Sequence, residues 1–435
     1  MDDRADDAGP PSRVSDRASD RGDEVTATYL DHAASTPVRP EAVTAMVPFL
    51  TECFGNPSGS HGAARAAKQA LEEARETVAD ALGADPGDVV FTAGGTEADN
   101  LAVEGAARAA RSAGGGDGIV TTAFEHKGVL AACDRLAREG FRVHRAAVDR
   151  AGIVDLDALG DALDAQTAVV SVMLVNNEVG TIQPLSDVAR LVAERAPRAI
   201  LHTDSVQAVP WIDVATAATD ARLVAISAHK FGGPKGTGAL IARRGAALVP
   251  LIEGGGQERG MRAGTVNVAG VVAMATALRL TVEQRTTEVE RIRVLRDRLA
   301  AGLAAAVPDC FFNGDVDRKV AGNCHVGFPG VEAEVLLVAL DRAGVYAAAG
   351  SSCSSGASEP SHVLEAMGMS RTEALASIRL SLGFASTDAD IDRALEVIPA
   401  TVADLRRASG ASELAGAASA PKGGAGYPGG ERVRP

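Results

Sequence analysis

Short apolar runs, each followed by polar residues and then by a helical stretch, recur through the middle of the chain. The runs cover residues 89–92, 118–124, 168–175, 199–203 and 221–227. Short runs rich in β-branched residues are typical of buried strands. Strands that alternate with helices predict a mostly parallel sheet covered by helices on both faces. The pattern therefore predicts an α/β fold.

Polar residues follow these expected strands. In open sheets of parallel strands, ligands bind outside the carboxyl ends of the strands. The residues expected at these ends are Thr96, His126, Asn177, Asp204, Gln207 and Lys230. Their shared placement predicts one ligand site at this edge of the sheet.

The remaining pattern divides the chain into further parts. A long helical stretch at 266–306 is expected to link two domains, and short strands and helices follow it. The two ends of the chain are poor in large apolar residues, which is typical of segments that do not fold. We expect a disordered acidic extension at 1–27, a segment joining the small domain at 28–38, a large domain at 39–285, a small α+β domain at 286–407 and a flexible tail at 408–435.

The composition of the chain argues against several classes of function. The chain has 435 residues, 46% of them hydrophobic, which is enough for two cores. A formal charge of −14 without a basic block argues against binding to nucleic acids or anionic membranes. The five cysteines are odd in number and form no CxxC pair, so we expect neither a disulfide framework nor a metal site, and a cytoplasmic location. No apolar run approaches membrane-spanning length, and the N-terminus does not resemble a secretory signal.

Lys230, at the end of a buried strand, suits Schiff-base chemistry. Partial burial lowers the pKa of an ammonium group, so the amine can be nucleophilic near neutral pH. Pyridoxal phosphate needs such a lysine, an acid at the pyridine nitrogen and a phosphate cradle. Asp204 offers the acid, and Gly95 and Thr96 open a helix whose N–H groups can bind an anion. Further groups for the phosphate, the ring oxygen or the ring face are Gln207, Ser227, His229 and His126.

Each of these residues also has an ordinary structural interpretation. A lone lysine at a strand end is more often solvated and inert. The Gly-Gly-Thr stretch can be a plain turn before a helix, and His126 a partly buried structural histidine. Asp204 can be a helix N-cap, the commoner role of an Asp after a strand. Their joint placement in the expected chain order favours the cofactor site.

Several segments between about residues 28 and 400 match one enzyme family. They lie at 29–37, 55–58, 91–98, 125–127, 175–184, 204–209, 227–236 (SAHKFGGPKG), 254–260, 350–356 (GSSCSSG) and 359–363. With them the chain resembles the cysteine desulfurases of the NifS/IscS type, group I, within the class V aminotransferase family of pyridoxal phosphate enzymes. The resemblance implies fold type I of these transferases. That fold has a large domain with a mostly parallel, seven-stranded sheet and a smaller α+β C-terminal domain.

The resemblance also implies a role for each residue of the expected site. Lys230 would bond the cofactor, Asp204 would pair with the pyridinium nitrogen, and His126 would stack on the ring and move protons. The other residues implied to bind the cofactor are Gly95, Thr96, Asn177, Gln207, Ser227, His229 and Thr265. Thr265 would reach the phosphate of the other subunit in a homodimer. Arg379, with Asn177 nearby, would hold the substrate carboxylate, as a bidentate guanidinium does well; the ordinary alternative for Arg379 is a surface ion pair.

Cys353 distinguishes the implied reaction. Small neighbours leave its sulfur accessible, whereas an inert buried cysteine is the better interpretation of Cys133 and Cys310. L-cysteine would bind the cofactor, Lys230 would remove the α-proton, and the Cys353 thiolate would attack the substrate sulfur. The products would be L-alanine and a Cys353 persulfide, which a mobile loop could deliver to an acceptor. No basic residue adjoins Cys353, so its activation is expected from His126 or from the substrate complex.

Partners and alternatives follow from the same comparison. The expected sulfur acceptor is an iron–sulfur scaffold or a tRNA or cofactor thiolation enzyme, and Cys353 could transiently ligate an iron–sulfur cluster. The tail after 408 departs from the family pattern, which puts the scaffold partnership in question. The alternative activities are a selenocysteine or cysteine-sulfinate lyase and a class V aminotransferase, none of which needs Cys353. An alternative of another class is a non-catalytic assembly partner, against which the retention of Lys230 and Cys353 counts.

Overall fold

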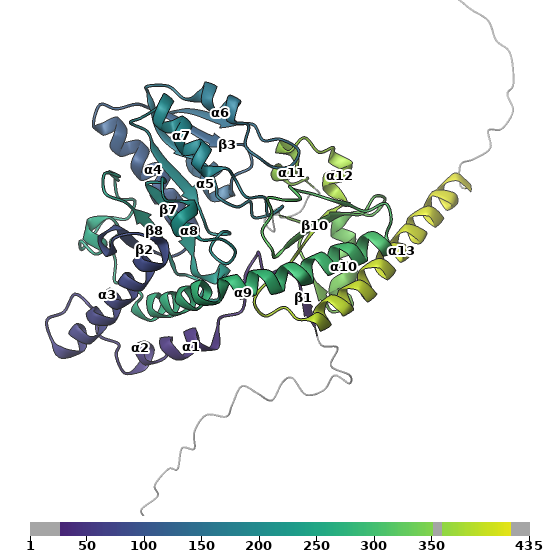
Figure 1. Ribbon diagram of the computed structural model, residues 1–435, viewed down its shortest axis with the longest axis horizontal. Coiled ribbons are helices and arrows are strands. Elements are labelled where there is room, and N and C mark those ends of the chain that lie inside the picture. The colour runs from purple at the N-terminus through teal and green to yellow at the C-terminus, as the bar shows by residue number, and fades with distance from the viewer. Residues whose placement is uncertain (1–26, 351–358, 419–435) are drawn as a thin grey trace, which may run out of the picture.

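The computed structural model describes residues 27–350 and 359–418, and the side chains as far as residue 410. The predicted N-terminal extension, Cys353 and the last residues of the predicted tail therefore lie outside the described residues, apart from residue 27. Figure 1 shows two bodies side by side, with one long helix, α9 (Val268–Ala306), running along both.

The larger body is built on a seven-stranded sheet, which confirms the predicted α/β class. Its strand order is β2-β8-β7-β6-β5-β3-β4, and only β8 runs antiparallel to its neighbours. The strands are β2 (Val89–Thr92), β3 (Gly118–Thr122), β4 (Arg142–Ala146), β5 (Thr167–Ser171), β6 (Ile200–Asp204), β7 (Leu223–Ser227) and β8 (Gly238–Ala242).

Two of these strands, β4 and β8, do not follow from the apolar pattern. β4 is an edge strand whose residues are mostly exposed, so it lacks the apolar run of a buried strand. β8 is fully buried, but the glycine-rich stretch before it favours a turn and hides the start of the strand. Strand pairing, rather than local pattern, decides both.

Helices cover both faces of this sheet. Alternate residues along β7 belong to different cores: Val224 and Ile226 face one, and Leu223 and Ala225 face the other. The first core is closed by α3 (Gly62–Leu82), α6 (Leu156–Ala162), α7 (Leu185–Arg195), α8 (Val214–Ala217) and the first half of α9. The second core is closed by α4 (Gly95–Ser112) and α5 (Lys127–Arg138). The short helices α1 (Pro40–Met46) and α2 (Pro48–Thr51) pack on α9.

The smaller body contains a three-stranded antiparallel sheet. Its strand order is β12-β10-β9, made of β9 (Phe311–Phe312), β10 (Asn323–Gly327) and β12 (Ser377–Ser381). Its core also takes residues from the second half of α9, from α10 (Ala333–Arg342) and from α13 (Asp388–Ala418). The first strand of the chain, β1 (Thr28–Tyr29), pairs with β11 (Val345–Tyr346). The helices α11 (His362–Ala366) and α12 (Arg371–Leu375) complete this part.

Two of the predicted domain boundaries fall inside continuous helices. The division at 285/286 falls inside α9, so the two cores share one helix. Helix α13 continues to Ala418, so the first part of the segment predicted as a flexible tail, 408–435, is helical as far as residue 418. The stretch 408–418 contains Gly and Ser, which favour a flexible segment, yet alanine, the best helix former, is its commonest residue. The other domain limits stay predictions.

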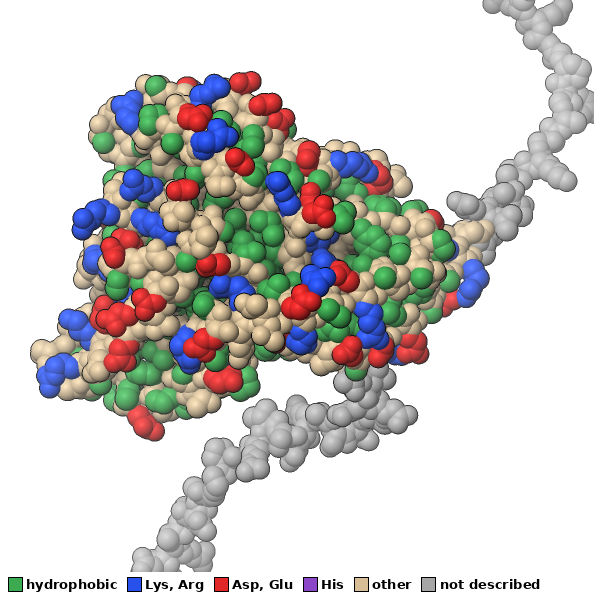
Figure 2. Space-filling model, viewed as in Figure 1, with side chains coloured by type: hydrophobic (Ala, Val, Ile, Leu, Met, Phe, Trp, Pro, Cys, Tyr) green, Lys and Arg blue, Asp and Glu red, His purple; other side chains and the backbone are tan. Residues whose placement is uncertain are grey.

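On the face shown in Figure 2, acidic and basic side chains are interspersed, without a basic patch. None of the described helices is long and apolar enough to cross a membrane.

Candidate active site

Lys230 lies directly after β7, in a single turn at Ala228–Lys230. Its Nζ donates hydrogen bonds to the backbone oxygens of Ala33, at 2.6 Å, and Ala34, at 2.9 Å. Burial, followed by the nearby Arg379 charge, lowers the pKa of Lys230 from 10.5 to about 8. The amine can therefore lose its proton close to neutral pH, which is the property that Schiff-base formation requires.

Asp204 ends the neighbouring strand β6 and is buried. Its Oδ1 accepts a hydrogen bond from the N–H of Val206 at 2.9 Å. Burial raises the pKa of Asp204, while His126, that hydrogen bond and Lys230 act in the opposite direction. Asp204 is not the cap of the following helix, since the N-cap residue of α8 is Asp213. Its carboxyl group is thus available to a ligand.

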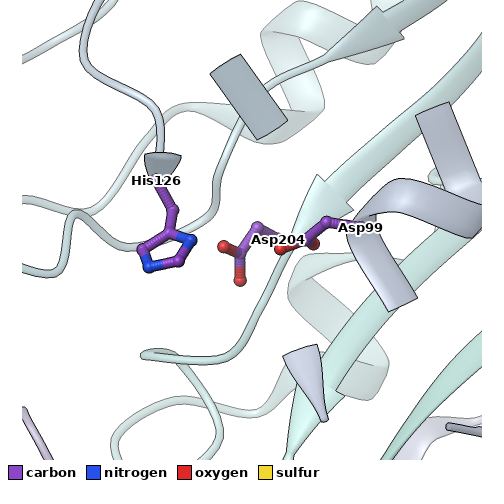
Figure 3. A group of neighbouring side chains, drawn as sticks. All are labelled: Asp99, His126 and Asp204. Carbon is purple, nitrogen blue, oxygen red and sulfur yellow. The ribbon is translucent and has the colours of Figure 1, made fainter. Parts of the chain in front are cut away.

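His126 is the N-cap of α5, and its Nδ1 accepts from the N–H of Gly128 at 3.1 Å. Burial lowers its pKa, against the attraction of Asp204. Polar atoms of His126, Asp204 and Asp99 all lie within 4.8 Å of one another. In the view of Figure 3, Asp204 lies between the other two side chains. Because Nδ1 accepts from Gly128, the neutral imidazole carries its proton on Nε2, where it can donate that proton and take it back.

The start of α4 forms a cradle beside these groups. Gly94 has φ 149°, a conformation that side chains disfavour, and α4 begins at Gly95. A Cβ at Gly95 would lie 2.7 Å from Cγ2 of Val206 and 3.4 Å from Cβ of the buried Ser227. Thr96, the next residue, is exposed. A glycine is therefore needed here, and the free N–H groups of a helix start suit a phosphate.

Three further predicted residues lie around Lys230. Gln207 donates from Nε2 to the oxygen of Ala33 at 2.8 Å, so it shares that acceptor with Lys230. His229 lies 3.4 Å from Ser35 through its Nδ1, and burial lowers its pKa to about 4. Oδ1 of Asn177 is buried and has no hydrogen-bond partner within 27–350 and 359–418. Asn177, Gln207 and Lys230 line one pocket.

Arg379, on β12 of the smaller body, is buried rather than part of a surface ion pair. Its guanidinium donates to the oxygen of Asn177 at 2.8 Å and to Oδ1 of Asp31 at 2.8 Å. Its Nε finds no partner in the described part of the chain. Arg379 thus places a cation beside Asn177 and keeps one donor free.

Two predicted residues are not brought into this group. Thr265 is exposed, in a loop that follows the turn Glu258–Gly260. That turn is held by a buried ion pair between Glu258 and Arg75 at 2.8 Å. Glu258 and Arg259 have positive φ values of 47° and 57°, which non-glycine residues rarely adopt. Cys353 lies outside the described residues.

The residues present fit pyridoxal phosphate. They supply an amine of lowered pKa, a buried acid, an imidazole and a glycine cradle, while Oδ1 of Asn177 lacks a partner among residues 27–350 and 359–418.

Three residues near the site were not predicted from the sequence. They are the buried Asp99 and His202, which lie close to Asp204, and Asp31, the partner of Arg379. Asp99 follows Thr96 by three residues and so shares its helix face, a signal that could have revealed it.

Known proteins share this fold and most of this sequence. The family model described as aminotransferase class-V matches residues 28–394. A solved structure titled NifS-like protein superposes with a TM-score of 0.82 and 35% identity, covering 87% of this chain and 100% of its own. The chain therefore belongs to the class-V aminotransferase family, with the α/β fold of pyridoxal phosphate enzymes.

Similar curated proteins identify the branch of that family. A cysteine desulfurase of Cereibacter sphaeroides is 46% identical over 390 residues, which cover 89% of this chain and 99% of the relative. An IscS-like cysteine desulfurase of Mycobacterium tuberculosis is 45% identical over 386 residues, covering 88% and 98%. Within the class-V aminotransferases, this chain belongs with the cysteine desulfurases.

Proposed function

We propose that this enzyme removes sulfur from L-cysteine with pyridoxal phosphate, yielding L-alanine and a persulfide on Cys353. The observation that carries the proposal is the joint placement of Lys230, Asp204 and His126, with the Lys230 amine at a pKa of about 8. Membership of the cysteine desulfurases supports the choice of substrate.

Each residue of the site would bind a different part of the cofactor or substrate. Lys230 would hold the cofactor, Asp204 would face its ring nitrogen, and the start of α4 at Gly95 and Thr96 would hold its phosphate. The cofactor, once bound, withdraws electrons from the substrate's α-carbon and stabilises negative charge there. Asn177 would offer its unpartnered Oδ1 to the ring or to the substrate. Gln207, Ser227 and His229 would supply further polar contacts to the cofactor.

The protein's own side chains would then move protons and hold the substrate. Arg379 binds the substrate carboxylate with its free donor, and its charge helps to keep the Lys230 amine unprotonated. Lys230 accepts the α-proton at Nζ. The Cys353 thiolate attacks the substrate sulfur, the carbon–sulfur bond breaks, and His126 supplies or accepts the proton that this exchange requires.

Measuring alanine and sulfide together tests this function. Purified protein is mixed with L-cysteine and a reductant, and equal amounts of both products are expected. Lys230→Ala and Cys353→Ser should abolish both, whereas the controls Lys235→Ala and Cys53→Ser change a lysine and a cysteine that the proposal does not use. Full activity of Cys353→Ser on cysteine would contradict the persulfide and favour a lyase.

A homodimer is the proposed assembly, with Thr265 reaching the cofactor phosphate of the other subunit. An exposed apolar row on and after α1 and α2 supports it: Val43, Val47, Leu50 and Phe54 are 45%, 48%, 58% and 74% exposed. Mixing inactive Lys230→Ala with inactive Thr265→Ala chains should restore part of the activity, because a mixed dimer has one intact site. No recovery in a proven mixed dimer would contradict this role of Thr265.

The destination of the sulfur is the final part of the proposal. The persulfide would pass to an acceptor protein for iron–sulfur cluster assembly or for thiolation. Transfer of ³⁵S from labelled cysteine to a purified iron–sulfur scaffold or to a thiolation enzyme would identify which acceptor is used. The cytoplasmic location stays a prediction from the cysteine pattern.

A further inference from the structure

A second buried acid lies next to Asp204. Asp99, on α4, is 1% exposed, and His202, on β6, is fully buried. Nδ1 of His202 lies 2.9 Å from Oγ of Ser171 on β5, so the ring is fixed in place. A polar atom of Asp99 lies within 4.8 Å of one on Asp204. A row of three buried polar residues, Asp99, His202 and Ser171, therefore lies next to Asp204, the acid that is expected to face the cofactor.

Asp99 and His202 face each other with unsatisfied atoms. Oδ1 of Asp99 and Nε2 of His202 lie 3.6 Å apart, slightly beyond a hydrogen bond. Neither atom has a hydrogen-bond partner anywhere in the described part of the chain. Buried polar atoms without partners are rare in folded proteins. A small approach of the two groups would satisfy both atoms, provided that one proton lies between them.

The surrounding charges decide which group holds that proton. Asp99 faces two other buried acids, Asp204 and Glu125, and burial together with these neighbours raises its pKa well above 3.8. Burial lowers the pKa of His202 to about 3, so its ring is neutral. Burial raises the pKa of Asp204 as well, but His126, the hydrogen bond from Val206 and Lys230 act against that rise. The neighbours of Asp204 therefore favour its ionisation, whereas the neighbours of Asp99 oppose its ionisation.

We propose that Asp99 is a positioning residue that stays protonated and donates its proton to Nε2 of His202, leaving Asp204 as the anion that faces the cofactor ring. In this arrangement Nδ1–H of His202 donates to Oγ of Ser171. Hydrogen bonds then link Asp99 on α4, His202 on β6 and Ser171 on β5. Holding Asp99 neutral avoids repulsion between two buried carboxylates. The inference rests on the proposed function only in assigning Asp204 to the cofactor.

Infrared spectroscopy of the purified full-length holoprotein tests the protonation state directly, because carboxylic acids and carboxylates absorb at separate frequencies. Comparing wild type with Asp99→Asn at neutral pH, we expect the loss of one acid band that shifts in ²H₂O. Asp161→Asn, on the exposed side of α6, controls for the loss of a surface carboxylate. Loss of a carboxylate band in Asp99→Asn would overturn the proposal.

Two further measurements separate positioning from a structural role. His202→Phe keeps the acid but removes its acceptor, so the acid band should move to higher frequency; an unmoved band would overturn the proposal. The pH midpoint of the bound cofactor's absorption should be unchanged in Asp99→Asn, which mimics the protonated acid. A lower midpoint would show that a negative charge had been removed and that Asp99 is ionised. The infrared result does not depend on which amino acid is the substrate.

Discussion

Replacing Lys230 with methionine should change how the stability of the cofactor-free protein depends on pH. The amine lies in a buried site where its pKa falls from 10.5 to about 8. Between these values the unfolded lysine is protonated and the folded one is neutral. The unfolded state therefore binds more protons, and the free energy of unfolding of the wild type rises with pH across this window.

The size of this effect follows from the two pKa values. One unit of pKa corresponds to about 1.4 kcal/mol, so the fall from 10.5 to about 8 corresponds to about 3 kcal/mol. The free energy of unfolding of the wild type, relative to that of Lys230→Met, should increase by about this amount from below pH 8 to above pH 10.5. Hydrogen bonds from Nζ to Ala33 and Ala34 add an offset that mainly shifts the whole curve.

Urea unfolding of both proteins without cofactor, at a series of pH values, measures the difference. Ionisation of other groups affects both proteins and cancels in that difference. Lys235→Met removes an exposed lysine of the following loop and is the matched control. A difference between wild type and Lys230→Met that stays flat or falls as the pH rises would refute the reasoning, because the lysine would then not be destabilised as a cation.

Three further predictions concern the cradle, the loop anchor and the substrate site. Gly95→Ala should weaken cofactor binding, because its Cβ would lie 2.7 Å from Val206, and adding Val206→Ala should restore it; fluorescence titration with pyridoxal phosphate measures both. Glu258→Ala should lower the free energy of unfolding by about 3–5 kcal/mol in urea, because it leaves the Arg75 guanidinium buried without its partner; a loss below about 1 kcal/mol would contradict a buried ion pair. Arg379→Lys should raise KM for cysteine about tenfold, the loss of one charge-assisted hydrogen bond, with a smaller effect on kcat; a fall in kcat at constant KM would contradict carboxylate binding.

Much of the large body could be predicted from the sequence. Strands β2, β3, β5, β6 and β7 are buried on both faces, so their apolar runs are continuous and visible without a structure. Polar residues at the ends of these strands also show in the sequence. Parallel strands bring such ends to one edge, which is why Lys230, Asp204 and His126 could be grouped in advance.

Contacts between distant parts of the chain could not be predicted in this way. The oxygens of Ala33 and Ala34 that hold Lys230 come from the N-terminal segment, almost 200 residues away in sequence. Arg379 reaches Asp31 across a separation of 348 residues. No local pattern encodes such pairs, because they depend on how the two bodies pack on α9.

The sequence alone determined the α/β class, the alternation that builds the sheet and the residue types offered at its edge, because periodicity and strand ends are local properties. The tertiary structure decided which groups are charged. Asp99 and Asp204 are the same residue type, yet His126 and Lys230 act against the effect of burial on the pKa of Asp204, whereas burial, Asp204 and Glu125 all raise the pKa of Asp99. Burial and neighbouring charge set a pKa, and both arise only when the chain has folded.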